Sequence, residues 1–147
     1  MKGEAGGSVR IEQRMDAPIE NVAAYIGDFR NAKEWMVGVE SVKKLGENAY
    51  RLTLESPIGR IEPETRIASH DARSISWVYT SVIDGGGRVD VSPDNGGCVV
   101  TYTGEFALKR KLLNRAARFV GVERFARKNG ERSLLRLKHL MEARRYL

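Results

Sequence analysis

From about residue 39 to residue 108, short segments of alternating apolar and polar side chains follow one another along the chain. Tyr50, Leu52 and Leu54, for example, share one phase and are separated by polar residues. A period of two residues is typical of a β-strand with one buried face. Short connections between successive strands allow antiparallel neighbours, whereas parallel neighbours need a long crossover. The sequence therefore predicts an antiparallel meander that packs on one face.

Groups of turn residues separate these segments. Asn95-Gly96 is a strong hairpin signal, because both residue types tolerate a positive φ. The glycine run at residues 84–87 (DGGG) is predicted to form another hairpin turn. It opens no helix, so we do not expect it to cradle a phosphate group. Residues 61–67 alternate throughout and are predicted to form one continuous strand.

Helical patterns lie before and after the meander. A first strand that ends at Met15 is followed by Pro18, a residue type that favours the first position of a helix. A break near Gly27 separates this helix from a second short helix that runs toward Trp35. The chain closes with a predicted helix from residue 110 to residue 145, in which apolar residues recur on one stripe.

These elements predict an α+β fold, in which a curved antiparallel sheet of six or seven strands surrounds a long C-terminal helix, with two short helices after the first strand. A chain of 147 residues has the usual size of one domain. We expect residues 8–147 to form a single domain and residues 1–7 to form a flexible N-terminal segment.

Several classes of protein are not indicated. One cysteine cannot form an internal disulfide, and two histidines are too few for a typical structural zinc site. No apolar run is long enough to span a membrane, and the N-terminus lacks the apolar stretch of a secretory signal. We therefore expect a cytoplasmic protein that has no metal centre and no cofactor.

The predicted inner face of the sheet carries several side chains with an apolar body and a polar tip. A pocket that orients an apolar ligand needs a few such tips on an apolar wall. Each Tyr or Trp taken alone is more simply a core residue, but so many polar tips in one small core indicate solvent or ligand. No residue is assigned a catalytic role. The candidate ligand-binding residues are Gln13, Trp35, Thr65, Trp77, Tyr79, Tyr102, Phe106, Glu123, Ala126 and Gly130.

The C-terminal helix contributes three of these candidates from its apolar stripe. Ala126 and Gly130 are small, and small residues on a buried stripe would leave room between helix and sheet. Glu123 lies on the same stripe, and a carboxylate is costly to bury alone. We expect it to face a polar cavity, to pair with Arg127 or to lie beyond the sheet edge, and the sequence leaves these alternatives open.

Basic residues are concentrated at the C-terminal end. Residues 109–147 hold 13 Lys/Arg and 3 Asp/Glu, a net charge of +10, whereas residues 1–108 hold 12 and 16, a net charge of −4. The simpler interpretation is the solvated outer face of a long helix. The alternative is a peripheral partner, either an anionic membrane surface or an acidic protein. Nucleic acid is not indicated, because no nucleic-acid-binding motif is recognisable.

Several segments resemble the START-like (SRPBCC) superfamily with its helix-grip fold, especially the polyketide cyclase/dehydrase branch. Residues 15–22 (MDAPIENV) are similar to the strand-to-helix signature of that branch. Residues 96–102 (GGCVVTY) resemble its last hairpin, with Cys98 where Thr is commoner. Residues 134–142 (LLRLKHLME) resemble its closing helix. Residues 38–50 (GVESVKKLGENAY) also resemble the membrane-linked accessory protein of carbon monoxide dehydrogenase, which belongs to the same superfamily, although the glycine-rich tract here is shorter.

The resemblance implies a cavity that binds a hydrophobic or amphipathic small molecule, such as a lipid, a polyketide or an isoprenoid-like compound, between the sheet and the C-terminal helix. One alternative is an aromatase/cyclase-like enzyme that moves protons with a tyrosine, Glu123 or a bound water. Such an enzyme needs a positioned acid/base pair, and no pair has a persuasive spacing in the sequence. Another alternative is an accessory or assembly factor associated with the membrane through the basic helix.

Overall fold

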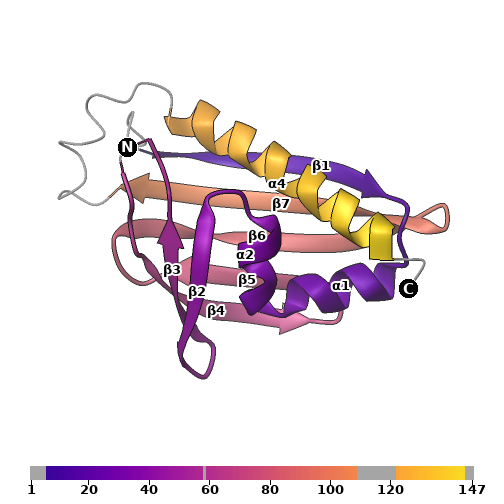
Figure 1. The fold of residues 1–147 in the computed structure, drawn as a ribbon, viewed down its shortest axis with the longest axis horizontal. Helices are drawn as coiled ribbons and strands as arrows, with labels where there is room; N and C mark the ends of the chain where they lie inside the picture. Colours follow the sequence, from indigo (N-terminus) through magenta and orange to yellow (C-terminus); the bar gives the residue numbers. More distant parts are fainter. Residues whose placement is uncertain (1–5, 58, 109–121, 145–147) are drawn as a thin grey trace.

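The computed structural model describes residues 6–57, 59–108 and 122–144 (Figure 1). Its elements follow the chain in the order β1 (Gly6–Met15), α1 (Ile19–Gly27), the 3-10 helix η1 (Phe29–Asn31), α2 (Ala32–Trp35), β2 (Val39–Gly46), β3 (Ala49–Leu54), β4 (Glu64–Asp71), β5 (Ser74–Tyr79), β6 (Ile83–Asp94), β7 (Gly97–Leu108) and α4 (Val122–Arg144). The predicted α+β helix-grip fold is confirmed, with a long C-terminal helix and short helices after the first strand.

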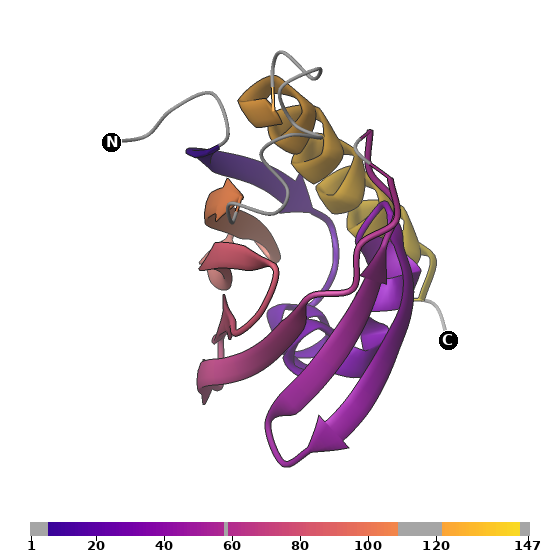
Figure 2. The ribbon, with the colours of Figure 1, turned by 90° about the vertical axis from the view of Figure 1, so that its left-hand side faces the viewer.

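The seven strands form one antiparallel sheet in the order β1-β7-β6-β5-β4-β3-β2. The three helices α1, α2 and α4 lie on the same side of this sheet (Figure 1). Figure 2 shows that the sheet curves from β1 round to the β2–β3 hairpin, and that α4 lies between these two edges. The curved sheet and α4 therefore enclose the interior of the protein.

The core lies between the sheet and the apolar faces of α1 and α4. The predicted stripe of α4 is buried, with Leu134 at 1%, Leu137 at 0% and Met141 at 3% exposure. Val22 of α1 and Val100 of β7 are also fully buried. The alternation read from the sequence is thus the alternation between the core and the outer face.

The hairpin predicted at Asn95-Gly96 forms as expected, with φ values of 45° and 81°. The turn predicted at residues 84–87 is wrong, because these residues belong to β6 and pair with β5 and β7. The connection from β5 to β6 lies earlier and contains Val82 with a φ of 70°. Glycine is needed in β6 for close approach and not for a turn, since a Cβ on Gly86 would lie 2.1 Å from the backbone oxygen of Trp77.

Two predicted boundaries also differ from the structure. The continuous strand predicted over residues 61–67 begins only at Glu64, and Ile61 makes an isolated bridge to Leu54. Pro63, which has no N–H to donate to a ladder, lies between them. The first strand already begins at Gly6, so the predicted flexible segment falls mainly on residues 1–5, which lie outside the described residues. The first part of the predicted C-terminal helix, residues 110–121, lies outside them as well.

Candidate ligand-binding cavity

A cavity with two adjoining chambers lies between the sheet and α4. The outer chamber has a volume of about 180 Å³ and the inner chamber a volume of about 120 Å³. The two chambers adjoin because five residues line both of them: Val37, Leu54, Tyr79, Tyr102 and Asn129. The cavity lies where the sequence predicts room, between the aromatic inner face of the sheet and the small residues of α4.

The inner chamber is dominated by the indole of Trp77, which is only 3% exposed. Trp77 pairs with Gly87 across β5 and β6, and a Cβ on that glycine would lie 2.4 Å from Cζ2 of the indole. The ring of Phe29 lies 5.3 Å from the indole, and the ring of Tyr102 is stacked at 6.4 Å. The missing side chain at Gly87 therefore lets the indole lie against the sheet, where aromatic neighbours hold it.

The polar atom of this indole is buried. Nε1 of Trp77 has no hydrogen-bond partner of ordinary geometry among the described residues. The hydroxyl of Tyr79 is nevertheless within reach, because its interaction with the Trp77 side chain lowers the pKa of that phenol against the larger effect of burial. The polar tips of Trp77 and Tyr79 therefore lie together on the cavity wall.

The hydroxyls of Tyr79 and Tyr102 are the other polar tips of the wall. Burial is the main cause that raises the pKa of both phenols above the ordinary value of 10.0. Both tyrosines are therefore neutral at physiological pH and can donate a hydrogen bond. The hydroxyl of Tyr102 lies against Gly104, where an added Cβ would be 2.5 Å from the oxygen. Gly104 thus provides the space that this phenol occupies.

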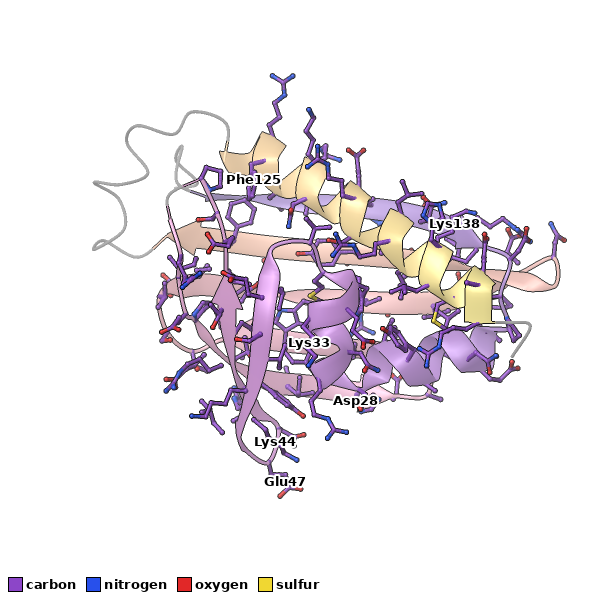
Figure 3. All side chains as sticks on the ribbon, in the orientation of Figure 1. Asp28, Lys33, Lys44, Glu47, Phe125 and Lys138 are labelled. Carbon is purple, nitrogen blue, oxygen red and sulfur yellow. The ribbon has the colours of Figure 1, made fainter. Side chains whose placement is uncertain are left out.

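The outer chamber has an apolar floor and an acidic rim. Ile61 and Ile83 form a small buried cluster in which Phe106 and Tyr79 are partly buried. On the helix side the chamber is lined by Phe125, near the N-terminal end of α4 (Figure 3), and by Ala126. Two carboxylate residues line the same chamber, Glu55 and Glu105.

Arg60 holds the segment beside Glu55 in place. Its guanidinium lies 3.1 Å from a carboxylate oxygen of Glu55 and 3.2 Å from one of Glu40 on β2. All three side chains are substantially exposed, so this arrangement fixes geometry and contributes little to stability.

Hydrogen bonds from α4 fix the segment between α2 and β2. Asn129 Nδ2 donates to the backbone oxygen of Val37 at 2.7 Å, and the backbone N–H of Val37 donates to Ser133 Oγ at 2.9 Å. Ser133 Oγ in turn donates to the backbone oxygen of Asn129 at 2.7 Å. Neither polar residue was predicted from the sequence to belong to the site. Asn129 and Ser133 are four residues apart and directly precede Gly130 and Leu134 on the inner face of the helix. This spacing places both on one side of the helix, next to the inner face, and was the signal available in the sequence.

Most of the predicted site residues line the cavity. Trp35, Trp77 and Gly130 lie in the inner chamber and Phe106 and Ala126 in the outer one, while Tyr79 and Tyr102 line both. Gly130 was expected to leave room between helix and sheet, but this accounts for only part of the need for glycine there. A Cβ there would lie 2.5 Å from Cδ1 of Ile11, so glycine also allows α4 to pack closely on β1.

Three predicted site residues lie outside both chambers. Gln13 Nε2 donates to the backbone oxygen of Arg14 at 3.0 Å, and Thr65 Oγ1 donates to the backbone oxygen of Tyr50 at 3.1 Å. Glu123 is exposed, and its Oε2 accepts from the backbone N–H of Ser8 on the edge strand β1 at 3.4 Å. The last of its three alternatives, a position at the sheet edge, is the observed one. We therefore leave these three residues out of the site.

The outer face of α4 carries the described part of the basic segment. We call this set the basic face: Arg124, Lys128, Arg132, Leu135, Arg136 and His139, all of which are exposed. Leu135 is 45% exposed and lies in a shallow depression with Arg132, Arg136 and His139. None of the helices that the structure describes is long and apolar enough to cross a membrane. No group of His, Cys, Asp and Glu within the described ranges is arranged to hold a metal ion.

The comparisons with known proteins agree with this architecture. A family model described as "Polyketide cyclase / dehydrase and lipid transport" matches residues 7–142. No curated protein matches the sequence.

Solved structures share the fold at low sequence identity. A protein from Thermus thermophilus is 18% identical with a TM-score of 0.77, over 93% of this chain and 98% of that one. The Zhui aromatase/cyclase from a Streptomyces species is 14% identical with a TM-score of 0.75, over 95% of both chains. A START superfamily protein from Mycobacterium smegmatis is 14% identical with a TM-score of 0.69, over 95% of this chain and 97% of that one. At these identities the likeness shows the START-like fold alone.

Proposed function

The chain belongs to the polyketide cyclase/dehydrase and lipid transport family, and we propose that it binds a hydrophobic or amphipathic small molecule, such as a lipid, a polyketide or an isoprenoid-like compound, in the cavity between the sheet and α4. The observation that carries this proposal is a pair of adjoining, mainly apolar chambers with a few inward polar tips, which is the usual composition of a small-molecule site. An apolar cavity of about 150 Å³ holds a molecule of the size of benzene. Each chamber therefore suits a group of about one ring, and the two together suit a ligand of about two rings or a chain of similar volume.

We propose binding ahead of catalysis. An aromatase/cyclase-like reaction needs an acid and a base within reach of one substrate. Glu123, the carboxylate considered for that role, lies at the sheet edge and not in the cavity. The titratable residues of the described cavity wall are Tyr79 and Tyr102, whose phenols have a raised pKa and stay protonated at neutral pH, so that neither offers a base, and Glu55 and Glu105 in the outer chamber.

Native mass spectrometry tests this function directly. Protein purified from its own host should carry a small molecule that is released on denaturation. Ala126→Phe should fill the outer chamber and abolish this co-purification, because Ala126 lines that chamber. Ala107→Phe is the matched control, since Ala107 is exposed on β7. Ligand retained equally in the two variants would show that the cavity is not the binding site.

A separate observation favours a peripheral role, and we propose that the basic face docks on an anionic membrane surface. Its cations Arg124, Lys128, Arg132 and Arg136 recur every fourth residue and so form one line along the helix. Beside this line lies the exposed Leu135. A row of cations on an exposed helix face is attracted by anionic lipid headgroups, and the apolar stripe of α4 stays buried in the core.

Co-sedimentation with vesicles that contain phosphatidylserine tests the membrane proposal. The wild-type protein should bind at low salt and less at physiological salt, because salt screens surface charge. The double variant Arg132→Gln/Arg136→Gln should lose about 1 kcal/mol of binding free energy for each charge near the surface. Lys43→Gln/Arg66→Gln, with the same change of charge on exposed sheet positions, is the control. Wild-type protein that stays in the supernatant at both salt concentrations would contradict the proposal and leave an acidic protein as the partner to search for.

A further inference from the structure

The chain contains two Asn-Gly pairs, Asn95-Gly96 and Asn129-Gly130. In such a pair the backbone nitrogen of the glycine can attack the side-chain amide carbon of the asparagine, because glycine has no Cβ to hinder the approach and its backbone rotates freely. The first pair lies between β6 and β7, and the second lies within α4. The two pairs share the same chemistry, so the fold decides which of them can react.

Asn95 and Gly96 form the exposed tip of the β6–β7 hairpin. Among the described residues, the one hydrogen bond to this pair is donated by the Arg14 guanidinium to the backbone oxygen of Asn95, at 3.3 Å. The side-chain amide of Asn95 and the N–H of Gly96 are therefore not held. Apart from its chain neighbours, no described residue lies within 4 Å of a Cβ placed on Gly96. Because strand pairing begins at Asp94 and Gly97, the backbone of Asn95 can rotate toward the reactive geometry without breaking the ladder.

Asn129-Gly130 lies inside α4, where the fold occupies both reacting groups. Asn129 Nδ2 donates to the backbone oxygen of Val37 at 2.7 Å, and the backbone oxygen of Asn129 accepts from Ser133 Oγ at 2.7 Å. Gly130 is buried, and its N–H belongs to the hydrogen-bond ladder of the helix. Its backbone lies so close to β1 that an added Cβ would be 2.5 Å from Cδ1 of Ile11. An attack within this pair therefore requires the helix to unwind first.

We propose that Asn95 is a site of spontaneous deamidation in the folded protein and that the fold protects Asn129. The backbone nitrogen of Gly96 forms a bond to Cγ of Asn95 while the bond from Cγ to Nδ2 breaks. The proton of the Gly96 amide leaves with the side-chain nitrogen as ammonia, and a cyclic succinimide remains. Water then opens the ring: addition at Cγ gives aspartate, and addition at the backbone carbonyl gives isoaspartate, whose main chain runs through the side chain. Water is the only co-reactant, and nothing is oxidised or reduced.

The modification changes the charge and the length of the hairpin tip. Arg14 already pairs with Asp94 and Asp16 there, so the new carboxylate joins a tip whose guanidinium is shared between two acidic side chains. Isoaspartate also lengthens the main chain of a two-residue turn, and turn length sets the register of a hairpin. The tip lies toward the opposite end of β6 and β7 from Gly104 and Phe106, which line the outer chamber (Figure 1). The modification therefore alters the hairpin and leaves the cavity unchanged, and the inference does not depend on the proposed function.

Peptide mapping by mass spectrometry tests the inference on the full chain. Trypsin separates the two sites, because cleavage after Arg88 and Lys109 releases residues 89–109 and cleavage after Lys128 and Arg132 releases residues 129–132. When the native protein is incubated in mildly alkaline buffer, residues 89–109 should convert to an aspartate form and an isoaspartate form. Residues 129–132 should convert at least about a hundredfold more slowly, because that reaction waits for the helix to open. In urea that unfolds the chain, the two rates should become comparable.

Two variants and an unincubated sample provide the controls. Asn95→Gln should abolish the conversion of residues 89–109, since the longer side chain closes the corresponding ring far more slowly. Asn95→Asp supplies the standard for the aspartate form, so that the isoaspartate form is recognised by its different retention. The unincubated sample corrects for conversion during digestion. An Asn95 that stays intact in the native protein overturns the inference, and so does an Asn129 that converts as fast as Asn95 before the chain is unfolded. Neither result bears on the proposed binding function, which is measured by ligand content.

Discussion

Gly86 lies so close to β5 that no other residue should fit there. A Cβ on Gly86 would lie 2.1 Å from the backbone oxygen of Trp77 and 3.1 Å from its carbonyl carbon. These are backbone atoms in the middle of a paired strand, so they cannot swing aside as a flexible side chain would. Relief requires β5 and β6 to separate where Trp77 enters the cavity. We expect Gly86→Ala to lower the free energy of unfolding by about 3 kcal/mol, the upper part of the range for overpacking.

Urea denaturation followed by circular dichroism measures this effect. With a slope of about 1–3 kcal/mol per molar urea, the midpoint should fall by roughly 1–3 M. Gly46→Ala is the matched control, because nothing lies within 4 Å of the added Cβ and its φ is not positive. The control should stay within about 0.5 kcal/mol of the wild type. If both variants unfold at the same urea concentration, the close approach of β5 and β6 is not what requires glycine.

The remaining predictions concern the contacts of α4. Ser133→Ala removes the acceptor of the Val37 N–H and should cost about 1–2 kcal/mol of stability by urea denaturation, whereas Ser133→Thr, which keeps the oxygen, should cost less. The Lys138 ammonium, followed by the backbone N–H of Asp16, holds the pKa of Glu142 below its ordinary value of 4.5. A pKa lowered by folding gives stability that is present at neutral pH and is lost as the pH falls through the folded-state pKa. Glu142→Gln should therefore lower the melting temperature at pH 7 and make little difference at pH 2, and an equal loss at both values would contradict the assigned cause.

Periodicity was sufficient to predict the architecture. The alternation in the strands and the stripe of Leu134, Leu137 and Met141 report which side of each element is buried, and burial is what a hydrophobic pattern encodes. Glycine was ambiguous, because a glycine run is equally compatible with a turn and with a close approach of two backbones. The contact with Trp77 decides between a turn and a close approach. Trp77 lies beside these glycines only because β5 pairs with β6.

Which polar side chains line the cavity also depends on strand pairing, which the sequence alone does not show. Thr65 and Tyr79 are directly opposite each other on β4 and β5, and both were predicted to point inward as polar tips. Thr65 Oγ1 reaches the backbone oxygen of Tyr50 and is satisfied within the sheet. The longer side chain of Tyr79 extends past the backbone and lines both chambers.

Two inward residues with the same pattern thus have different roles, and the difference lies in side-chain reach. A short hydroxyl on a strand can reach the backbone of a neighbouring strand, whereas the polar atom of a Tyr or Trp lies beyond it. Such an atom is satisfied by a neighbouring side chain or by whatever faces the sheet. In this protein α4 faces the sheet, and it presents Ala126 and Gly130 near these rings. Neither side chain has a hydrogen-bonding group, and the polar residues that α4 adds to the wall, Asn129 and Ser133, already hydrogen-bond to the backbone of Val37.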